Sequence, residues 1–243
     1  MGSSQRLASL VQRLRLYKPE EEEDDGGDTV GPAVPSSSAA TPRPDGFSPR
    51  RAAVLVCLFE DDDSQLRVIL TKRSSTLSTH SGEVSLPGGK AEAGDADDKE
   101  TALREAKEEI GLDPSLVTVV AVLEPFLSKH LLRVAPVIAV LSDKKAFTPV
   151  VNIAEVETVF DAPLEMFLKD ENRRSEEREW MGNKFTVHFF DFEAGNQKFL
   201  IWGLTASILI RAASAVYEQR PSFPEEKPKI KIPPSTTADC YLP

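Results

Sequence analysis

The chain has 243 residues, a length that fits one or two domains. Hydrophobic residues make up 40% of it, which is enough for an ordinary core. Its net charge of −10 argues against non-specific binding to nucleic acid or to an anionic membrane. No apolar run approaches the ~20 residues of a membrane helix. Cys57 and Cys240 are far apart in the sequence, so no disulfide framework is expected and the cytoplasm is the default location.

Residues 1–19 have the composition of an amphipathic segment. Residues 3–18 contain three arginines and no acid, which is typical of a targeting helix, so mitochondrial import is the alternative to a cytoplasmic location. The other interpretation, which we favour, is a short helix packed on the domain through one apolar stripe, formed by Leu7, Leu10, Val11 and Leu14.

The composition then changes twice. Residues 20–46 begin with a run of acidic residues and continue rich in Pro, Ser, Ala and Gly, which predicts a disordered linker. A single folded domain is expected at 47–220. Repeated Pro and Lys predict a loose tail at 221–243.

Within this domain, apolar runs predict a strand hairpin at 52–59 and 66–71. Further strands are expected at 83–86, 116–123, 133–141, 155–160, 184–192 and 198–201. Helices are expected at 99–110, 164–168 and 203–217. Because both hairpins and helical connections occur, we predict an α/β fold with a mixed sheet and helices on its faces.

The most informative stretch runs from Gly88 to Leu112. Pro87-Gly88-Gly89 predicts a turn of the backbone. The next segment has helical spacing, and Gly111 is a suitable stop residue. One face of this helix is apolar, and another carries Glu105, Glu108 and Glu109.

Like charges at this spacing repel, at a cost of roughly 0.2–0.5 kcal/mol for each pair. Arg104 lies four residues before Glu108 and offsets one charge only. A divalent cation with oxygen ligands, Mg²⁺ or Mn²⁺, would convert this repulsion into binding. A bare E-x-x-E-E pattern is more often a solvated helix face. The fixed register with a Gly-Gly turn, an Arg-Glu pair and a Gly stop favours the metal site.

That register resembles the Nudix box, G-x5-E-x7-R-E-U-x-E-E-x-G-U. The segment Arg104-Glu105-x-x-Glu108-Glu109-x-Gly111-Leu112 matches its second half. The first half departs, because one extra residue separates Gly89 from Arg104 and an acidic loop with Glu92 or Asp95 replaces the expected glutamate. The resemblance implies an α/β/α sandwich.

A second resemblance lies upstream, to the signature L-L-T-x-R-[SA]-x3-R-x3-G-x3-F-P-G-G of the coenzyme A diphosphatase branch of Nudix hydrolases, including its plant members. The matching residues are Thr71, Arg73, Ser74, Gly82 and Pro87-Gly88-Gly89. Ser78 stands where the signature has Arg, and Leu86 where it has Phe. The missing Arg matters, because Arg grips phosphate groups in a bidentate manner.

The two resemblances imply a site. Glu105, Glu108 and Glu109 would bind the metal and, together with Arg104, catalyse the reaction, with Arg104 orienting the carboxylates and the general base left open between Glu108 and Glu109. Substrate binding is assigned to Thr71, Lys72, Arg73, Ser74, His80, Gly82, Gly88 and Gly89. For Arg73 a surface ion pair is the alternative, and for His80 a turn cap. Glu155 and Glu157 are expected at an exposed strand edge rather than near the metal.

The implied reaction is hydrolysis of the pyrophosphate of coenzyme A, and of its thioesters, to 3′,5′-ADP and 4′-phosphopantetheine or its acyl form. Bound metal would neutralise charge and activate water. The alternatives are a pyrophosphatase for ADP-ribose, NADH, nucleotide sugars or oxidised nucleotides, and a binding module without turnover. The expected partner is a small nucleotide substrate, with no nucleic acid or membrane, and a homodimer is left open.

Overall fold

The computed structural model describes residues 5–17, 50–128, 132–180 and 183–224. The linker expected at 20–46 and most of the tail expected at 221–243 lie outside these ranges. None of the described helices is both long enough and apolar enough to cross a membrane.

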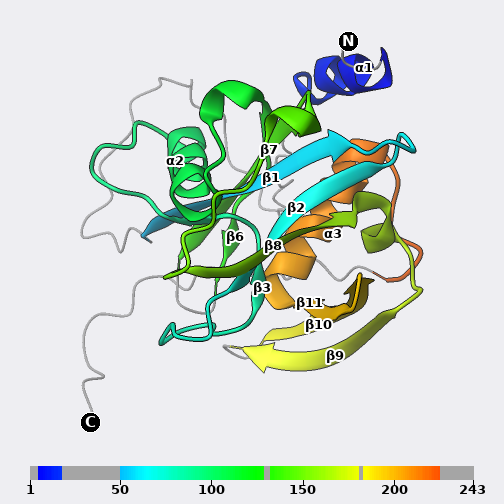
Figure 1. Ribbon diagram of the computed structural model, residues 1–243. Helices are drawn as coiled ribbons and strands as arrows, with labels where there is room; N and C mark the ends of the chain where they lie inside the picture. The colour runs from blue at the N-terminus through cyan, green and yellow to red at the C-terminus, as the bar shows by residue number, and fades with distance from the viewer. Residues whose placement is uncertain (1–4, 18–49, 129–131, 181–182, 225–243) are drawn as a thin grey trace, which may run out of the picture.

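The centre of the molecule is an eight-stranded mixed sheet (Figure 1). Strand β1 (Arg51–Glu60) pairs antiparallel with β2 (Leu66–Arg73) and parallel with β7 (Arg133–Leu141). The order β3-β2-β1-β7-β5 is completed by β3 (Val84–Ser85) and β5 (Val117–Val122), while three more strands join at β1, β7 and β2, namely β4 (Gly88–Lys90), β6 (Phe126–Leu127) and β8 (Val156–Pro163). The expected hairpin and mixed sheet are therefore confirmed.

Alternating side chains of β1 supply both faces of this sheet. Ala53, Leu55 and Cys57 belong to the core cluster that contains the apolar side of α2 (Asp98–Ile110). Val56 and Leu58 belong to the cluster that contains α3 (Gly203–Tyr217). The sheet therefore lies between two helical layers, as the α/β/α expectation requires.

A second, three-stranded sheet has the order β11-β10-β9 and lies beside α3 at the lower right of Figure 1. Strands β10 (Asn183–Ala194) and β11 (Gln197–Trp202) were expected, but β9 (Arg173–Trp180) was not. Its sequence, RRSEEREW, lacks apolar alternation because it is an edge strand. The guanidinium of Arg174 packs 4.3 Å from the ring centroid of Phe189 instead.

Short helices connect several strands. The helix expected at 164–168 is the 3₁₀ helix η3 (Leu164–Leu168), and two further 3₁₀ turns are η1 (Pro114–Leu116) and η2 (Lys144–Ala146). The expected turn at Gly88-Gly89 is wrong, because these residues form β4, in which Gly89 pairs with Ala53 of β1. A Cβ on Gly88 would lie 2.4 Å from the Ala53 carbonyl oxygen, so only glycine permits this approach.

Helix α1 (Gln5–Leu14) packs on the domain near the C-terminal end of α3. Leu7, Leu10 and Leu14 are buried in the same cluster as α3. Arg13 donates to the carbonyl of Val216 and lies 3.6 Å from Glu218. At the other end of the chain, Phe223 is also buried, so the packed part extends beyond the expected boundary at residue 220.

The docking of α1 predicts a contrast between two leucines of one segment. The residue Leu14 is 2% exposed, and Leu16 is 80% exposed. Leu14→Ala should lower the free energy of unfolding by about 2–5 kcal/mol, since it removes buried methyl groups and leaves a cavity. Leu16→Ala is the matched control and should leave it unchanged. Equal unfolding midpoints in urea for both variants would contradict the docking.

Candidate active site

The candidate site lies where α2 packs against β4. The side chain of Asp97 accepts hydrogen bonds from the backbone N–H groups of Lys99 and Glu100, which fixes the start of the helix. Gly111 ends it with φ +70°, the left-handed conformation that glycine adopts readily. The three glutamates of α2 that were expected to bind the metal differ in exposure: the side chains of Glu109, Glu105 and Glu108 are 2%, 15% and 54% exposed.

The Glu109 carboxylate is buried against β4 and β2. The backbone N–H of Gly88 donates to its Oε2 at 3.2 Å, and Nη1 of Arg73 lies 3.8 Å from its Oε1. Burial nevertheless raises the pKa of Glu109 to about 7, and repulsion from Glu105 and Glu155 acts in the same direction. The Gly88 N–H and the charge of Arg73 therefore compensate only part of the desolvation.

Glu105 lies directly over the second glycine of β4. A Cβ on Gly89 would be 2.4 Å from Oε1 of Glu105, so the absence of a side chain makes room for this carboxylate. Burial raises the pKa of Glu105, although the neighbouring Arg104 guanidinium opposes that shift. Gly88 and Gly89 thus act through their backbone, one by donating to Glu109 and the other by accommodating Glu105.

Arg104 connects the acidic groups of the site. Its guanidinium donates to both carboxylate oxygens of Asp95 at 3.0 and 3.1 Å and to the Lys90 carbonyl at 3.0 Å. It also donates to Oε2 of Glu108 at 3.0 Å and to Oε1 of Glu105 at 3.2 Å. With its donors used in this way, Arg104 is placed to orient the carboxylates, in line with the role expected from the sequence.

The acidic loop before α2 contains the partner of Arg104. The Asp95 side chain is buried and also accepts from Thr101 Oγ1 and from the backbone N–H of Glu92. The hydrogen bonds from Arg104 hold the pKa of Asp95 well below its usual range. Glu92 is exposed and lies 3.9 Å from Arg104. Of the two candidates for the first acidic position, Asp95 is therefore the one built into the site.

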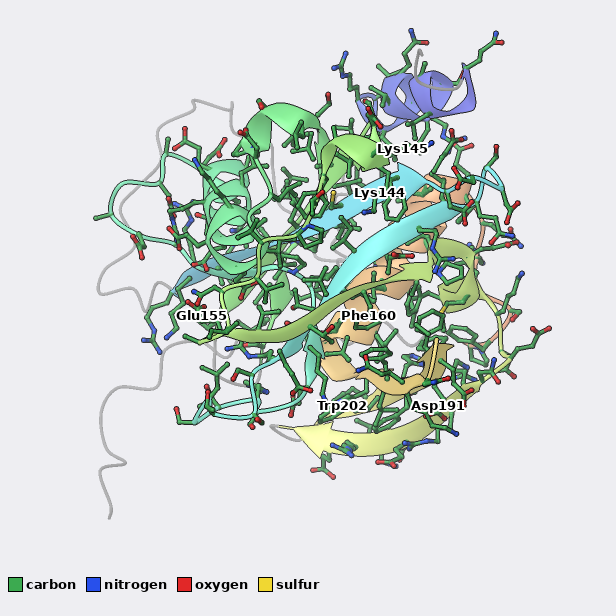
Figure 2. The ribbon with its side chains drawn as sticks, in the orientation of Figure 1. Lys144, Lys145, Glu155, Phe160, Asp191 and Trp202 are labelled. Carbon is green, nitrogen blue, oxygen red and sulfur yellow. The ribbon has the colours of Figure 1, made fainter. Side chains whose placement is uncertain are left out.

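Glu155 is a site residue that sequence reasoning assigned elsewhere. It lies just before β8, at the left of Figure 2 and below α2, and is half-buried. Its charge raises the pKa of both Glu105 and Glu109. The exposed strand edge expected for Glu155 and Glu157 holds only for Glu157, whose carboxylate lies 2.6 Å from Nζ of Lys72. Only the fold brings Glu155 to α2.

The upstream signature residues divide into three groups. Arg73, Gly88 and Gly89 lie at the buried carboxylates, as described above. Thr71 and Ser74 are buried, and their hydroxyls pair with Ser85 Oγ at 2.9 Å and with Thr76 Oγ1 at 2.8 Å. These internal bonds argue against the expected substrate contacts of both residues.

Lys72, His80 and Gly82 form the third group, which the structure does not gather at the carboxylates. Lys72 is paired with Glu157. His80 has φ +54°, Gly82 has φ +69°, and the Nδ1 of His80 lies 2.8 Å from Oε2 of Glu83. These features fit the alternative in which His80 stabilises a turn.

The chemistry of the donors fits a hard divalent cation. Two desolvated carboxylates that repel each other bind such an ion readily, because its charge relieves both effects. Within the described residues, no group of three or more His, Cys, Asp or Glu side chains already surrounds one point. Of the three expected metal ligands, Glu105 and Glu109 are the two that the fold buries near each other, while Glu108 is turned toward Arg104.

The raised pKa of Glu109 predicts the pH dependence of stability in metal-free protein. A carboxyl whose folded pKa exceeds its ordinary value of 4.5 contributes stability below pH 4.5, and loses it as the pH rises through about 7. Glu109→Gln should therefore be more stable than wild type at pH 8, by about 2–3 kcal/mol, with the difference vanishing near pH 5. Urea unfolding in the presence of a metal chelator, at pH 5 and pH 8, measures this difference in the free energy of unfolding.

Glu108→Gln, which alters a half-exposed carboxylate of the same helix, is the control and should show no such pH-dependent gain in stability over wild type. A Glu109→Gln variant that is less stable than wild type at pH 8 would contradict the burial argument.

Comparison with known proteins places this site in a family. The NUDIX domain model matches residues 49–199. Nudix hydrolase 15, mitochondrial, of Arabidopsis thaliana is 72% identical over 190 residues, covering 78% of this chain and 67% of that protein. Nudix hydrolase 22, chloroplastic, of the same plant is 61% identical over 239 residues, covering 95% and 79%.

A more distant relative is the peroxisomal coenzyme A diphosphatase NUDT7 of Mus musculus, which is 35% identical over 179 residues, covering 73% of this chain and 75% of that protein. The resemblance seen in the sequence is thereby confirmed at the level of the family. This chain belongs to the Nudix hydrolase family, whose members act on small nucleotide substrates and generally use divalent metal ions.

Proposed function

We propose that this protein is a pyrophosphatase that hydrolyses coenzyme A and its thioesters to 3′,5′-ADP and 4′-phosphopantetheine or its acyl form. Water adds to one phosphorus of the pyrophosphate, and the bridging P–O bond breaks. The observation that carries the proposal is the position of Arg73. This residue of the coenzyme A signature lies 3.8 Å from Glu109 of the Nudix helix, so both motifs contribute to one site. The mouse relative supports the same substrate.

Glu105 and Glu109 would hold Mg²⁺ or Mn²⁺, with Glu108 at the exposed rim of the helix. The ion would neutralise the pyrophosphate and activate water. Arg104 orients Glu105 and Glu108 through its hydrogen bonds. Arg73 adds positive charge beside Glu109, where the substrate phosphates are expected. Glu108 and Glu109 remain the two candidates for accepting the proton of the attacking water.

A second candidate function is hydrolysis of another nucleotide-linked pyrophosphate, such as ADP-ribose or a nucleotide sugar. Two observations favour it. Ser78 occupies the position where the coenzyme A signature has an arginine, and Lys72 is engaged with Glu157 at 2.6 Å. Neither Ser78 nor the paired Lys72 therefore offers a cation to the additional ribose phosphate of coenzyme A.

The non-catalytic alternative has less support. Assembling two desolvated carboxylates opposes folding, and a module that only bound nucleotides would have no need of the complete set of Arg104 and three glutamates. For the compartment, the names of the two plant relatives favour the mitochondrial alternative, or a chloroplast, over the cytoplasm that the sequence predicted.

A substrate panel with product identification tests the proposal. With Mg²⁺ or Mn²⁺, coenzyme A should give 3′,5′-ADP with a higher kcat/KM than ADP-ribose, NADH or a nucleotide sugar. Glu105→Gln should abolish turnover while the protein stays folded, whereas Glu193→Gln, at an exposed carboxylate paired with Lys198 in the other sheet, should retain it. A higher kcat/KM for ADP-ribose or a nucleotide sugar would replace coenzyme A by the second candidate.

The position of Arg73 makes a separate prediction about which phosphate it serves. Because it lies at Glu109, Arg73→Ala should lower kcat/KM by about 10- to 100-fold, the scale of a lost bond to a charged group, and equally for coenzyme A and dephospho-coenzyme A. Lys72→Ala, which removes the neighbouring cation that is paired with Glu157, is the control and should leave kcat/KM unchanged. A loss confined to coenzyme A would place Arg73 at the ribose phosphate instead.

A further inference from the structure

The segment between η2 and β8 is fixed to the C-terminal end of α2. The backbone N–H of Val150 donates to the Ile110 carbonyl at 2.9 Å, and that of Asn152 donates to the Glu109 carbonyl at 2.9 Å. The last carbonyls of a helix lack partners within it, so these bonds satisfy groups that would otherwise need water. The loop is therefore attached to the backbone of Glu109, which is a candidate metal ligand.

Asn152 is the residue through which this loop is organised. Its backbone carbonyl accepts from the N–H groups of Glu155 and Val156 at 3.0 and 2.9 Å. Its side-chain Oδ1 accepts from the N–H of Ala154 at 3.2 Å, which closes a tight turn. Its remaining side-chain group, Nδ2, donates to Oε1 of Glu155 at 3.1 Å.

The hydrogen bond from Asn152 Nδ2 to Glu155 acts against the electrostatic repulsion between Glu155 and the glutamates of α2. Glu155 is near enough to Glu105 and Glu109 to disfavour their charged forms, so all three carboxylates repel one another. A half-buried glutamate side chain in that position would lower its energy by rotating into water. The amide of Asn152 holds its carboxylate, while the Ser74 N–H fixes its backbone by donating to the Glu155 carbonyl at 2.8 Å.

We propose that Asn152 is a positioning residue of the active site, which ties the carboxylate of Glu155 to the C-terminal end of α2, where Glu109 lies, so that Glu155 supports binding of the divalent cation. This inference rests on the proposed function. It assigns to Asn152 an action through Glu155, distinct from its role in the turn.

The two roles of Asn152 are separable, because serine accepts the turn hydrogen bond but is too short to reach Glu155. The experiment is a double-mutant cycle on the full chain with Asn152→Ser, Glu155→Gln and the double variant, with the Kd for Mn²⁺ measured by calorimetry in the absence of substrate. Asn152→Ser should weaken Mn²⁺ binding by about tenfold or more, the scale seen when residues that orient metal ligands are changed. The double variant should bind as Glu155→Gln does.

Asp143→Ser is the matched control, because Asp143 closes a similar turn at the start of η2 by accepting from the N–H of Lys145 at 2.9 Å. It should leave the Kd unchanged. An unchanged Kd in Asn152→Ser, or effects that add in the double variant, would overturn the inference. If Asn152→Ser does not fold, Glu155→Asp withdraws the carboxylate from the intact Asn152 and should give the same loss. Absence of pyrophosphate hydrolysis in wild type refutes the proposed function instead, since the Mn²⁺ cycle is read without substrate.

Discussion

The active-site region is built around the burial of two like charges, those of Glu105 and Glu109, against the two glycines of strand β4. Glu105 and Glu109 point from α2 onto Gly88 and Gly89, and both carboxylates have a raised pKa because the surroundings desolvate them. Such an arrangement opposes folding unless other groups compensate it. Much of the architecture around α2 is explained as that compensation.

The compensation comes from elements that are distant in the sequence. Arg104 joins Asp95 of the preceding loop to Glu105 and Glu108, so the helix and the loop are fixed together. Strand β4 is held by its pairing with β1, the central strand of the sheet. The segment between η2 and β8, which contains Asn152, donates hydrogen bonds to the last carbonyls of α2. The site is thus carried by rigid elements, which is the condition for placing ligands of a metal ion accurately.

Local patterns were sufficient to predict the elements that have a strong period or a clear stop. The apolar runs of β1, β2 and β7 and the spacing of α2 up to Gly111 belong to this class. Strand β4 was missed because two glycines were read as a turn, whereas they serve a close approach to β1 and to Glu105. Strand β9 was missed because an edge strand needs no apolar alternation.

The site itself was predictable only as far as one helix carries it. Glu105, Glu108 and Glu109 follow from helical spacing, but their unequal burial does not. The choice of Asp95 over Glu92, the internal bonds of Thr71 and Ser74, and the position of Glu155 all depend on contacts between separate elements, which a single sequence does not display.

The central claim is that the buried carboxylates of α2 form the metal site, and proton release on metal binding tests it most directly. Calorimetric titration of Mn²⁺ in buffers of different ionisation enthalpy counts the protons that are released. Because the pKa of Glu109 is about 7 without metal, binding at pH 6 should release close to one proton. The release should vanish at pH 8.5 and in Glu109→Gln. Mn²⁺ binding without proton release at pH 6 would show that the ion is held elsewhere.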